Sequence, residues 1–539
     1  MDGPGPQRAR SPEDGAGGRR GAAARHRVSG LEAPRAAEVT SGAEAGPGSA
    51  AAAPAGPSAR SGRAAPRGAG THAAGLLTIA NVAIGVLNYL YSLSLTHLMP
   101  AAQYTVFAAV LSVLIIQGTI GSAGVPWVLA RDIAMRGDDP VAARRSVTFA
   151  FWLNVWSGAL LAGLVALVCA SFASSGAVVV TSLTAFLLAV SSTGAGWLQG
   201  HRRTNLIAVL KLSEVVVKVV TGLLLARATS GSAAMVLLAS LLGCLVLFAS
   251  FPSFARAIGR PTSMARTADL WLSAARIGGL QIGVAVIGAA DSLVVTMVDA
   301  VATDTAAYQA ASTLGRVPLF VSTAVSTAVF PLLVRDDSGR ARSRALVSYL
   351  LVSCFGWAVL VTVPPDVLGA LFPSDFSTLR VWLAFTAPLG VVAGLLNLLS
   401  TFEQARVDNW RPHLVLGGAA LVHVVAICVA GRFGGLHAYA VTTLVGAVVA
   451  VVAVLLLRSQ RSVPADLVAA LNPWVLVVAA GVVGAMVWAP GPLWWLAVTT
   501  VVGAAVACVA FPEFQRLLPR RWRGVLGRVV RDGRARHRR

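Results

Sequence analysis

The chain has 539 residues, of which 56% are hydrophobic and only 12% are charged, and its mean hydropathy is +0.72. These values exclude a soluble globular protein and indicate a membrane protein with many spans. The formal net charge is +21, but 20 of the 44 basic residues lie before residue 71 or after residue 511. Basic residues concentrated at the two ends of the chain are a pattern that sets the orientation of a membrane protein. Nucleic acid is therefore not expected as a partner.

The two ends of the chain have the composition of tails. Residues 1–70 are rich in Ala, Gly, Pro, Ser and Arg, which predicts a disordered basic cytoplasmic tail. No signal peptide is apparent, because the first apolar run begins near Gly75 and continues as a full span. Residues 512–539 form a second basic cytoplasmic tail, which we expect to lie on anionic lipids of the inner leaflet.

Between the tails, apolar runs separated by polar turns predict about fourteen transmembrane helices in an all-α polytopic membrane protein. The predicted spans are 75–95, 104–128, 147–171, 176–199, 206–226, 232–251, 272–298, 306–333, 345–364, 381–402, 412–431, 436–457, 467–489 and 493–511. Alternate loops hold 17 basic residues on one side and 3 on the other. Because cytoplasmic loops carry the excess of Lys and Arg, both termini are predicted to be cytoplasmic and the protein is expected in the plasma membrane.

An internal repeat recurs at a constant offset of 204 residues. The first six spans and the next six are paired by six identities: Gly75 with Gly279, Tyr104 with Tyr308, Leu129 with Leu333, Arg131 with Arg335, Asp132 with Asp336, and Arg202 with Arg406. An offset of six spans keeps both halves in the same orientation. The repeat therefore predicts two pseudo-symmetric six-helix bundles, at 75–260 and 270–460, with the transport pathway between them and two extra helices at 465–511.

Charges inside the spans are the first candidates for the substrate pathway, since they are costly in lipid and usually face a bundle interior. Lys211, Glu214 and Lys218 recur at a helical spacing that places them on one face. Lys218 lies too deep to reach the membrane surface easily, so it is the better contact for a cargo. The alternative is that Lys211 snorkels while Glu214 and Lys218 neutralise each other.

The stretch from Leu272 to Leu333 is predicted to form two helices that hold Arg276, Asp291 and Arg316. At about 1.5 Å per residue, Asp291 lies roughly 10 Å and Arg316 roughly 15 Å inside the same membrane face. An ion pair between them is therefore expected. It could line a transport route or serve only as structural glue, because buried charges must be paired in either case. The charges within the spans sum to +2, which suits an anionic cargo.

No catalytic constellation is found in the sequence. The chain lacks the GxxxxGK[ST], HExxH and GxSxG motifs, and its outer loops are short. The five cysteines lie in different spans without metal-binding spacing. We therefore expect no catalytic residues, no cofactor and no metal site.

Three segments resemble the polysaccharide flippases of the multidrug/oligosaccharidyl-lipid/polysaccharide superfamily. They are GGLQIGVAVIGAADSLVV, AAYQAASTLGRVPLF and AVFPLLVRD, at residues 278–295, 306–320 and 328–336. The resemblance covers residues 75 to about 460, and Asp291, Tyr308, Arg316 and Pro331 match positions that the family fills similarly. One departure is the first helix, which offers only Asn81 and Asn88 where lipid II flippases have basic residues.

The resemblance implies a transporter, not an enzyme, that carries a lipid-linked anionic glycan from the inner to the outer leaflet by alternating access. A coupling ion is a further partner that the resemblance allows. The alternatives are a cation-coupled multidrug exporter of the same superfamily and a membrane-embedded sugar-transferring enzyme. The candidate pathway residues are Asn81, Asn88, Lys211, Glu214, Lys218, Arg276, Asp291 and Arg316.

Overall fold

The computed structural model describes residues 69–136, 139–261, 268–298, 302–333, 339–405, 410–463, 465, 480–481, 483–488 and 491–510. Within these ranges the regular elements are helices. All of them belong to one compact unit, Ala65–Arg539. Nearly all of the predicted N-terminal tail, the C-terminal tail and most of the predicted span 467–489 lie outside the described residues.

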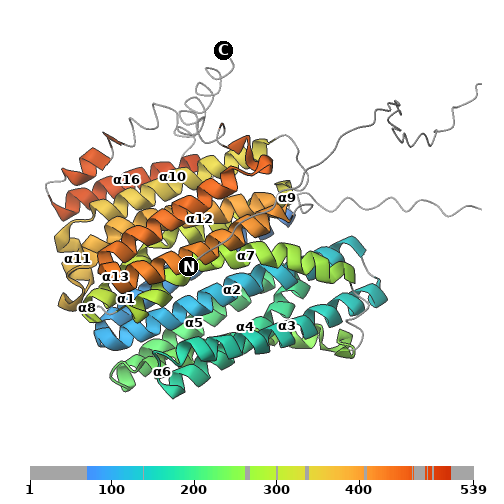
Figure 1. The fold of residues 1–539 in the computed structure, drawn as a ribbon. Coiled ribbons are helices and arrows are strands. Elements are labelled where there is room, and N and C mark those ends of the chain that lie inside the picture. Colours follow the sequence, from blue (N-terminus) through green and yellow to red (C-terminus); the bar gives the residue numbers. More distant parts are fainter. Residues whose placement is uncertain are drawn as a thin grey trace, which may run out of the picture. The chain divides into compact units, whose positions relative to one another are not determined.

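The first half of this unit consists of six α-helices. They are α1 (Ala69–Leu98), α2 (Ala101–Arg136), α3 (Pro140–Cys169), α4 (Ser175–Gly200), α5 (Thr204–Ala228) and α6 (Ala233–Leu247), followed by the short 3-10 helices η1 (Phe248–Ser253) and η2 (Ala255–Ala257). Helix α4 packs against α2, α3 and α6, and α1 packs along α5. In Figure 1 these blue-to-green helices gather together below α7.

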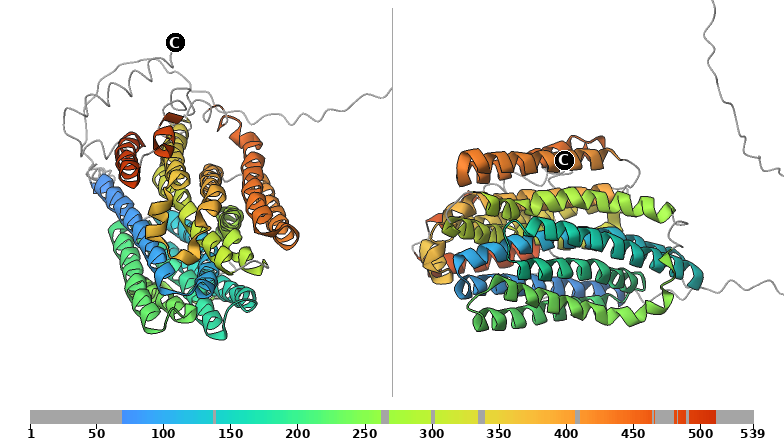
Figure 2. Two further views of the ribbon diagram at one scale, coloured as in Figure 1. Left: turned by 90° about the vertical axis from the view of Figure 1, so that its left-hand side faces the viewer. Right: turned by 60° about the horizontal axis from the view of Figure 1, so that its bottom comes forward.

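The second half has more breaks between its helices. It comprises α7 (Ala268–Val294), η4 (Val295–Met297), α8 (Ala302–Gly315), α9 (Val317–Leu333), α10 (Arg340–Thr362), α11 (Pro365–Leu371), η5 (Ser374–Phe376), α12 (Leu379–Gln404), α13 (Arg411–Leu455), η6 (Arg458–Gln460) and α16 (Pro492–Ala510). Helix α12 packs against α8, α9, α10 and α13 and is the centre of this half. The long helices of both halves run roughly parallel in the right-hand view of Figure 2.

Eight helical stretches of the described residues are long and apolar enough to cross a membrane. Helix α5 is not among them because Lys211, Glu214 and Lys218 interrupt its apolar sequence. Helices α8 and α9 are each too short, with 14 and 17 residues. The structure therefore shows a helical, multi-span membrane fold.

The predicted span 306–333 is wrong as a single helix. It is two helices, α8 and α9, which break at Arg316. Two residues later comes Pro318, which has no amide N–H to donate to the carbonyl of Leu314, so the regular hydrogen-bond ladder stops there. The predicted start at residue 306 is also too late, since α8 begins at Ala302.

Helix α13 combines the predicted spans 412–431 and 436–457. The backbone departs from helical geometry at Gly435, where φ is 70° and ψ is −173°. A left-handed φ of this kind is open to glycine at little cost. The two parts of α13 are thus separate helical segments joined at Gly435.

The repeat offset reappears in the helix bounds. Helices α4 (Ser175–Gly200) and α12 (Leu379–Gln404) both have 26 residues, and both of their ends differ by 204 positions. Each is also the helix around which its own half packs. Corresponding sequence positions therefore occupy corresponding structural positions in at least this helix pair.

The two halves meet most extensively along α2 and α7, which lie side by side in Figure 1. Gly124 of α2 and Gly278 of α7 face each other so closely that a Cβ on Gly124 would lie 3.4 Å from the Cα of Gly278. Small residues allow helix backbones to approach in this way within a membrane. The two backbones therefore touch here with no side chain between them.

Candidate functional site

The predicted ion pair between Asp291 and Arg316 is present. An Nη atom of Arg316 lies 2.7 Å from Oδ1 of Asp291, and the two side chains are 8% and 0% exposed. The carboxylate comes from α7 and the guanidinium from the break between α8 and α9. A buried carboxylate of this kind requires a partner, because an unpaired charge at such depth costs several kcal/mol.

Hydroxyl groups complete the coordination of the carboxylate. Ser312 donates to Oδ2 of Asp291 at 2.6 Å, and the Tyr308 hydroxyl donates to the same oxygen at 3.5 Å. The hydroxyl of Tyr439 donates to the backbone carbonyl of Asp291. Both carboxylate oxygens are thus occupied by donors from within the protein.

The helix break is what directs Arg316 into this cluster. Gly315 and Gly390 bring the break against α12, since a Cβ on Gly390 would lie 1.7 Å from the carbonyl oxygen of Gly315. Arg316 also donates to Ser292 Oγ at 2.7 Å and to the carbonyl of Ala289 at 3.4 Å. Its Nε has no hydrogen-bond partner among the described residues. The Nε–H of the guanidinium is therefore a donor without an acceptor among the described residues.

The guanidinium also joins the two halves of the protein. Arg316 donates to the hydroxyl of Ser112 on α2 at 3.1 Å, and these two residues are 204 positions apart. This is the offset of the internal repeat, so the bond connects equivalent positions. Arg316 consequently lies where α2 of the first half meets the break between α8 and α9 of the second.

A second polar group connects α1 with α5. Lys218 Nζ donates to Oδ1 of Asn88 at 2.5 Å, and both residues are half-buried. Glu214, one turn earlier on α5, is half-buried and makes no hydrogen bond or ion pair within the described residues. Lys218 therefore has a neutral amide as its hydrogen-bond partner, and two of the predicted pathway residues lie together.

The remaining predicted residues lie elsewhere. Lys211 is exposed on α5. Arg276 stacks over the ring of Trp410 at 5.9 Å, and its backbone carbonyl lies 2.5 Å from Nε2 of His413. Fifteen residues separate Arg276 from Asp291 on α7, which corresponds to about 22 Å along the helix. For Asn81 the structure describes the helix but not the side chain.

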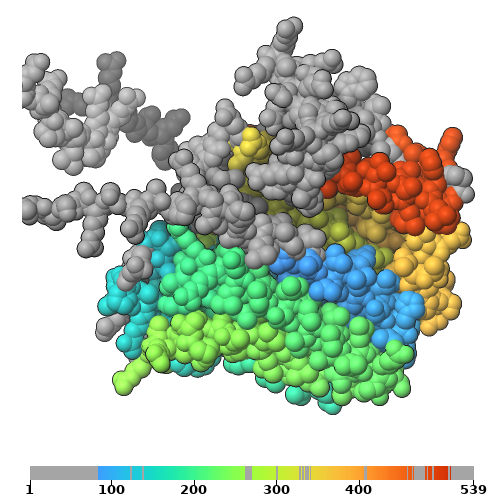
Figure 3. Space-filling model, turned by 180° about the vertical axis from the view of Figure 1, so that it is seen from behind, coloured from blue at the N-terminus to red at the C-terminus, as the bar shows by residue number. Residues whose placement is uncertain are grey.

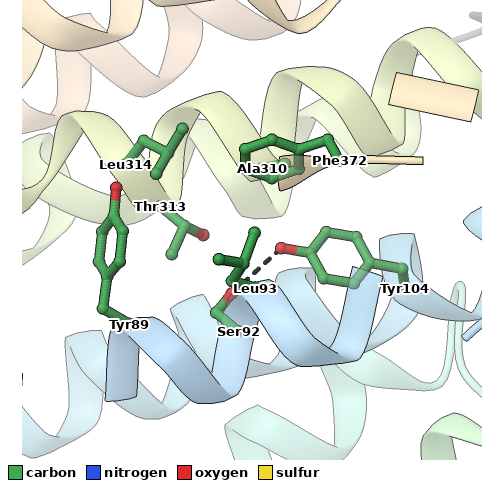
Figure 4. Close-up of a pocket in the computed structure, with 8 residues that line it drawn as sticks. All are labelled: Tyr89, Ser92, Leu93, Tyr104, Ala310, Thr313, Leu314 and Phe372. Atoms are coloured by element: carbon green, nitrogen blue, oxygen red, sulfur yellow. Dashed lines mark hydrogen bonds between the residues drawn. The ribbon is translucent and has the colours of Figure 1, made fainter. Parts of the chain in front are cut away.

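A small pocket lies between α1 and α8, as Figure 4 shows. Tyr89 and Ser92 line it from α1, Thr313 from α8 and Tyr104 from α2, with Ser92 and Tyr104 joined by a hydroxyl contact of 3.1 Å. Figure 3 shows α1, in blue, between the green helices of the first half and the yellow-orange helices of the second. The pocket thus lies at a further contact between the halves, where α1 and α2 meet α8.

Several residues of the ion-pair cluster were not predicted from the sequence. Ser312 precedes Arg316 by four residues and so shares its helical position, which is a signal that could have identified it. Ser112 could have been found by subtracting the repeat offset from Arg316. Tyr439 carried no signal in the sequence. Among the described residues, no group of three or more His, Cys, Asp or Glu could hold a metal ion.

Comparison with known protein families tests the family resemblance seen in the sequence. Residues 72–335 match the family model described as polysaccharide biosynthesis protein. The family resemblance seen in the sequence is confirmed. The matched region runs from α1 through α9 and so includes both Asp291 and Arg316, as well as Lys218 and Asn88. No curated protein is significantly similar to the chain.

Solved structures show that the fold is the one expected for the superfamily. The lipid II flippase MurJ in an inward closed conformation has a TM-score of 0.61 at 14% identity, covering 82% of this chain and 99% of that one. A MATE transporter from Vibrio cholerae has a TM-score of 0.53 at 14% identity, covering 74% and 96%. A MOP superfamily transporter from Pyrococcus furiosus has a TM-score of 0.52 at 16% identity, covering 74% and 97%. The protein thus has the fold that the lipid II flippase MurJ and these transporters share.

Proposed function

We propose that this protein flips a polyprenyl-pyrophosphate-linked oligosaccharide, or a related glycolipid precursor of the cell envelope, from the inner to the outer leaflet. The observation that carries this proposal is Lys218, a half-buried cation in α5 whose hydrogen-bond partner is the neutral Asn88 amide. A charge within a span is costly unless it is paired. Glu214, one turn earlier on α5, acts electrostatically on Lys218 but makes no ion pair with it, so the pyrophosphate of the cargo would supply the directly bound negative charge.

Arg316 is the second proposed anion contact. It lies at the interface of the two halves and keeps its Nε without a partner among the described residues. Guanidinium groups bind phosphate oxygens through several N–H donors at once. A cargo that enters between the halves would meet this side chain, while a hydrated cavity would pass the sugar.

The proposed architecture is two six-helix lobes, at 75–260 and 270–460, with both termini in the cytoplasm and alternating access between the lobes. The repeat offset shared by α4 and α12 and the Ser112–Arg316 bond support it. The two C-terminal spans at 465–511 would stand outside the duplication. Fourteen helices remain the proposed total.

A cation-coupled multidrug exporter is the alternative, since MATE transporters share the fold. A pathway for organic cations would need an acidic side chain open to its cargo. Asp291 is instead fully buried, with both carboxylate oxygens occupied by Arg316, Ser312 and Tyr308. The geometry therefore favours the anionic cargo.

The test compares Lys218→Ala with Arg227→Ala in vesicles that contain a labelled polyprenyl-pyrophosphoryl sugar. Arg227 is an exposed basic residue at the end of the same helix, so its removal controls for loss of charge. A hydrogen bond to a charged group contributes about 1.5–3 kcal/mol, so we expect Lys218→Ala to reduce flipping roughly 10- to 100-fold at equal inserted protein. Arg227→Ala should flip normally. Equal rates for Lys218→Ala and the wild type, or export of an organic cation in place of flipping, would contradict the proposal.

A further inference from the structure

His423 is a buried ionisable side chain for which the proposed function has no role. It lies on the first part of α13, is 1% exposed, and neither ring nitrogen has a hydrogen-bond partner among the described residues. Buried polar groups are nearly always paired, and an unpaired one costs about 1–3 kcal/mol. A neutral imidazole must still carry one N–H, so this site contains a donor and an acceptor without partners.

The surroundings make space for this imidazole. Gly446, on the part of α13 beyond Gly435, lies against the ring, because a Cβ at Gly446 would be 2.3 Å from Nδ1 of His423. Helix α7 packs against α13: Gly283 of α7 meets Leu416, and Val298, just beyond η4, meets Gly431. Along the chain, His423 lies between the two contact residues of α13, and Asp291 lies between their two partners, so the two residues are at the same height along the paired helices.

Asp291 is the charged group that acts electrostatically on His423. The other ionisable side chains around the same cluster are Tyr308 on α8, Tyr439 on α13 and, through Asp291, Arg316. Cys428 on α13 is exposed. In the described arrangement the cluster is neutral as a whole, because Arg316 balances Asp291 and burial disfavours a charge on the imidazole of His423.

We propose that His423 is a proton site that replaces Arg316 as the counter-charge of Asp291. This inference rests on the proposed function, in which Arg316 turns to the pyrophosphate of the cargo. Once Arg316 leaves, Asp291 is a buried carboxylate without a cation. His423 then accepts one proton from the aqueous phase, and its imidazolium pairs with Asp291.

The charges balance in both arrangements. With no cargo, the carboxylate is paired with the guanidinium and the imidazole is neutral. With cargo, the carboxylate is paired with the imidazolium, and the guanidinium is paired with the anion. One proton is bound for each cargo captured, and it is released when Arg316 returns to Asp291.

Proton uptake tests this inference separately from flipping. Full-length protein in weakly buffered detergent is titrated with farnesyl pyrophosphate, a soluble anionic probe, while a pH-indicator dye reports protons taken from solution. We expect uptake of about one proton per probe bound in the wild type and in His437→Gln, an exposed histidine on the same helix. His423→Gln keeps a polar side chain of similar size that cannot be protonated, and it should bind the probe without uptake.

The outcomes separate the two proposals. Probe binding by the wild type with no proton uptake overturns the role of His423 and leaves the anion site intact, as would full uptake by His423→Gln. Absence of probe binding together with absence of flipping by the wild type overturns the proposed function itself. In vesicles, the flipping rate of His423→Gln should no longer respond to a pH gradient that changes the wild-type rate several-fold.

Discussion

Removing Arg316 alone leaves a fully buried carboxylate without its cation. Arg316→Ala is therefore expected to lower the free energy of unfolding by about 3–5 kcal/mol and to reduce the amount of inserted protein. The double variant Arg316→Ala, Asp291→Ala removes both charges and should recover much of this loss. Thermal unfolding in detergent and the yield of inserted protein measure both effects.

Transport separates the structural role of the pair from its role in binding. If Arg316 contacts the cargo, the double variant should insert and fold but fail to flip a labelled polyprenyl-pyrophosphoryl sugar. Arg316→Lys should keep partial activity, because the charge remains while the planar fork is lost. Full activity of the double variant would reduce Arg316 to a structural ion pair.

At the scale of single residues, the sequence predicted the charges but not their hydrogen-bond partners. The depth of each residue, counted from its helix end, was enough to pair Asp291 with Arg316. Two helices joined by a short turn run back along each other, and the rise per residue is known, so residues at similar depths come close together. The hydroxyl of Tyr439 could not be foreseen, since it comes from a helix about 150 residues later and its position depends on tertiary packing. Arg276 is predicted as a pathway residue from its charge alone, and the structure places it over the ring of Trp410, away from the ion pair.

The break between α8 and α9 depends on close packing against α12. Gly390→Ala would place a Cβ 1.7 Å from the carbonyl oxygen of Gly315, a backbone atom that cannot rotate away. We expect this variant to lose several kcal/mol of stability or to fail to fold, because overpacking forces the backbone to shift. The measurement is the midpoint of thermal unfolding.

Gly356→Ala in α10 is the matched control. Nothing lies within 4 Å of the position that a Cβ on Gly356 would take, so the added methyl group meets open space. Alanine is more favourable than glycine within a helix by up to about 1 kcal/mol, so this variant should be as stable as the wild type or slightly more so. A similar loss of stability in both glycine variants would show that the contact with Gly315 is not the cause.

At the scale of helices, apolar runs located most elements to within a few residues, since length and hydropathy decide which segments cross a membrane. They could not show that a continuous apolar run breaks at Arg316. Pro318 was visible in the sequence, but proline is also tolerated inside membrane helices. Indeed Pro126 lies within the unbroken α2, so proline alone does not decide the outcome.

The proposed orientation of the whole molecule is tested by labelling single cysteines in intact cells. Thr303 at the start of α8 and Ser374 in η5 should react with an impermeant reagent from outside, whereas Gly339 before α10 should not. Thr378 donates to Asp304 at 2.9 Å, which holds the first two regions on one side of the protein. The opposite labelling pattern would reverse the proposed topology and the direction of transport with it.

The crossing of α2 and α7 at Gly124 and Gly278 has the geometry of a fulcrum. Ser112 lies 12 residues from Gly124 and Asp291 lies 13 residues from Gly278, so both are about 18–20 Å away along their helices. A rigid rotation of about 15° around the crossing, the size seen in other two-state proteins, would separate them by about 5 Å. The glycines would hardly move, while the 3.1 Å bond between Ser112 and Arg316 could not survive. The leverage of the two helices thus makes this hydrogen bond a contact that such a rocking of the halves would break.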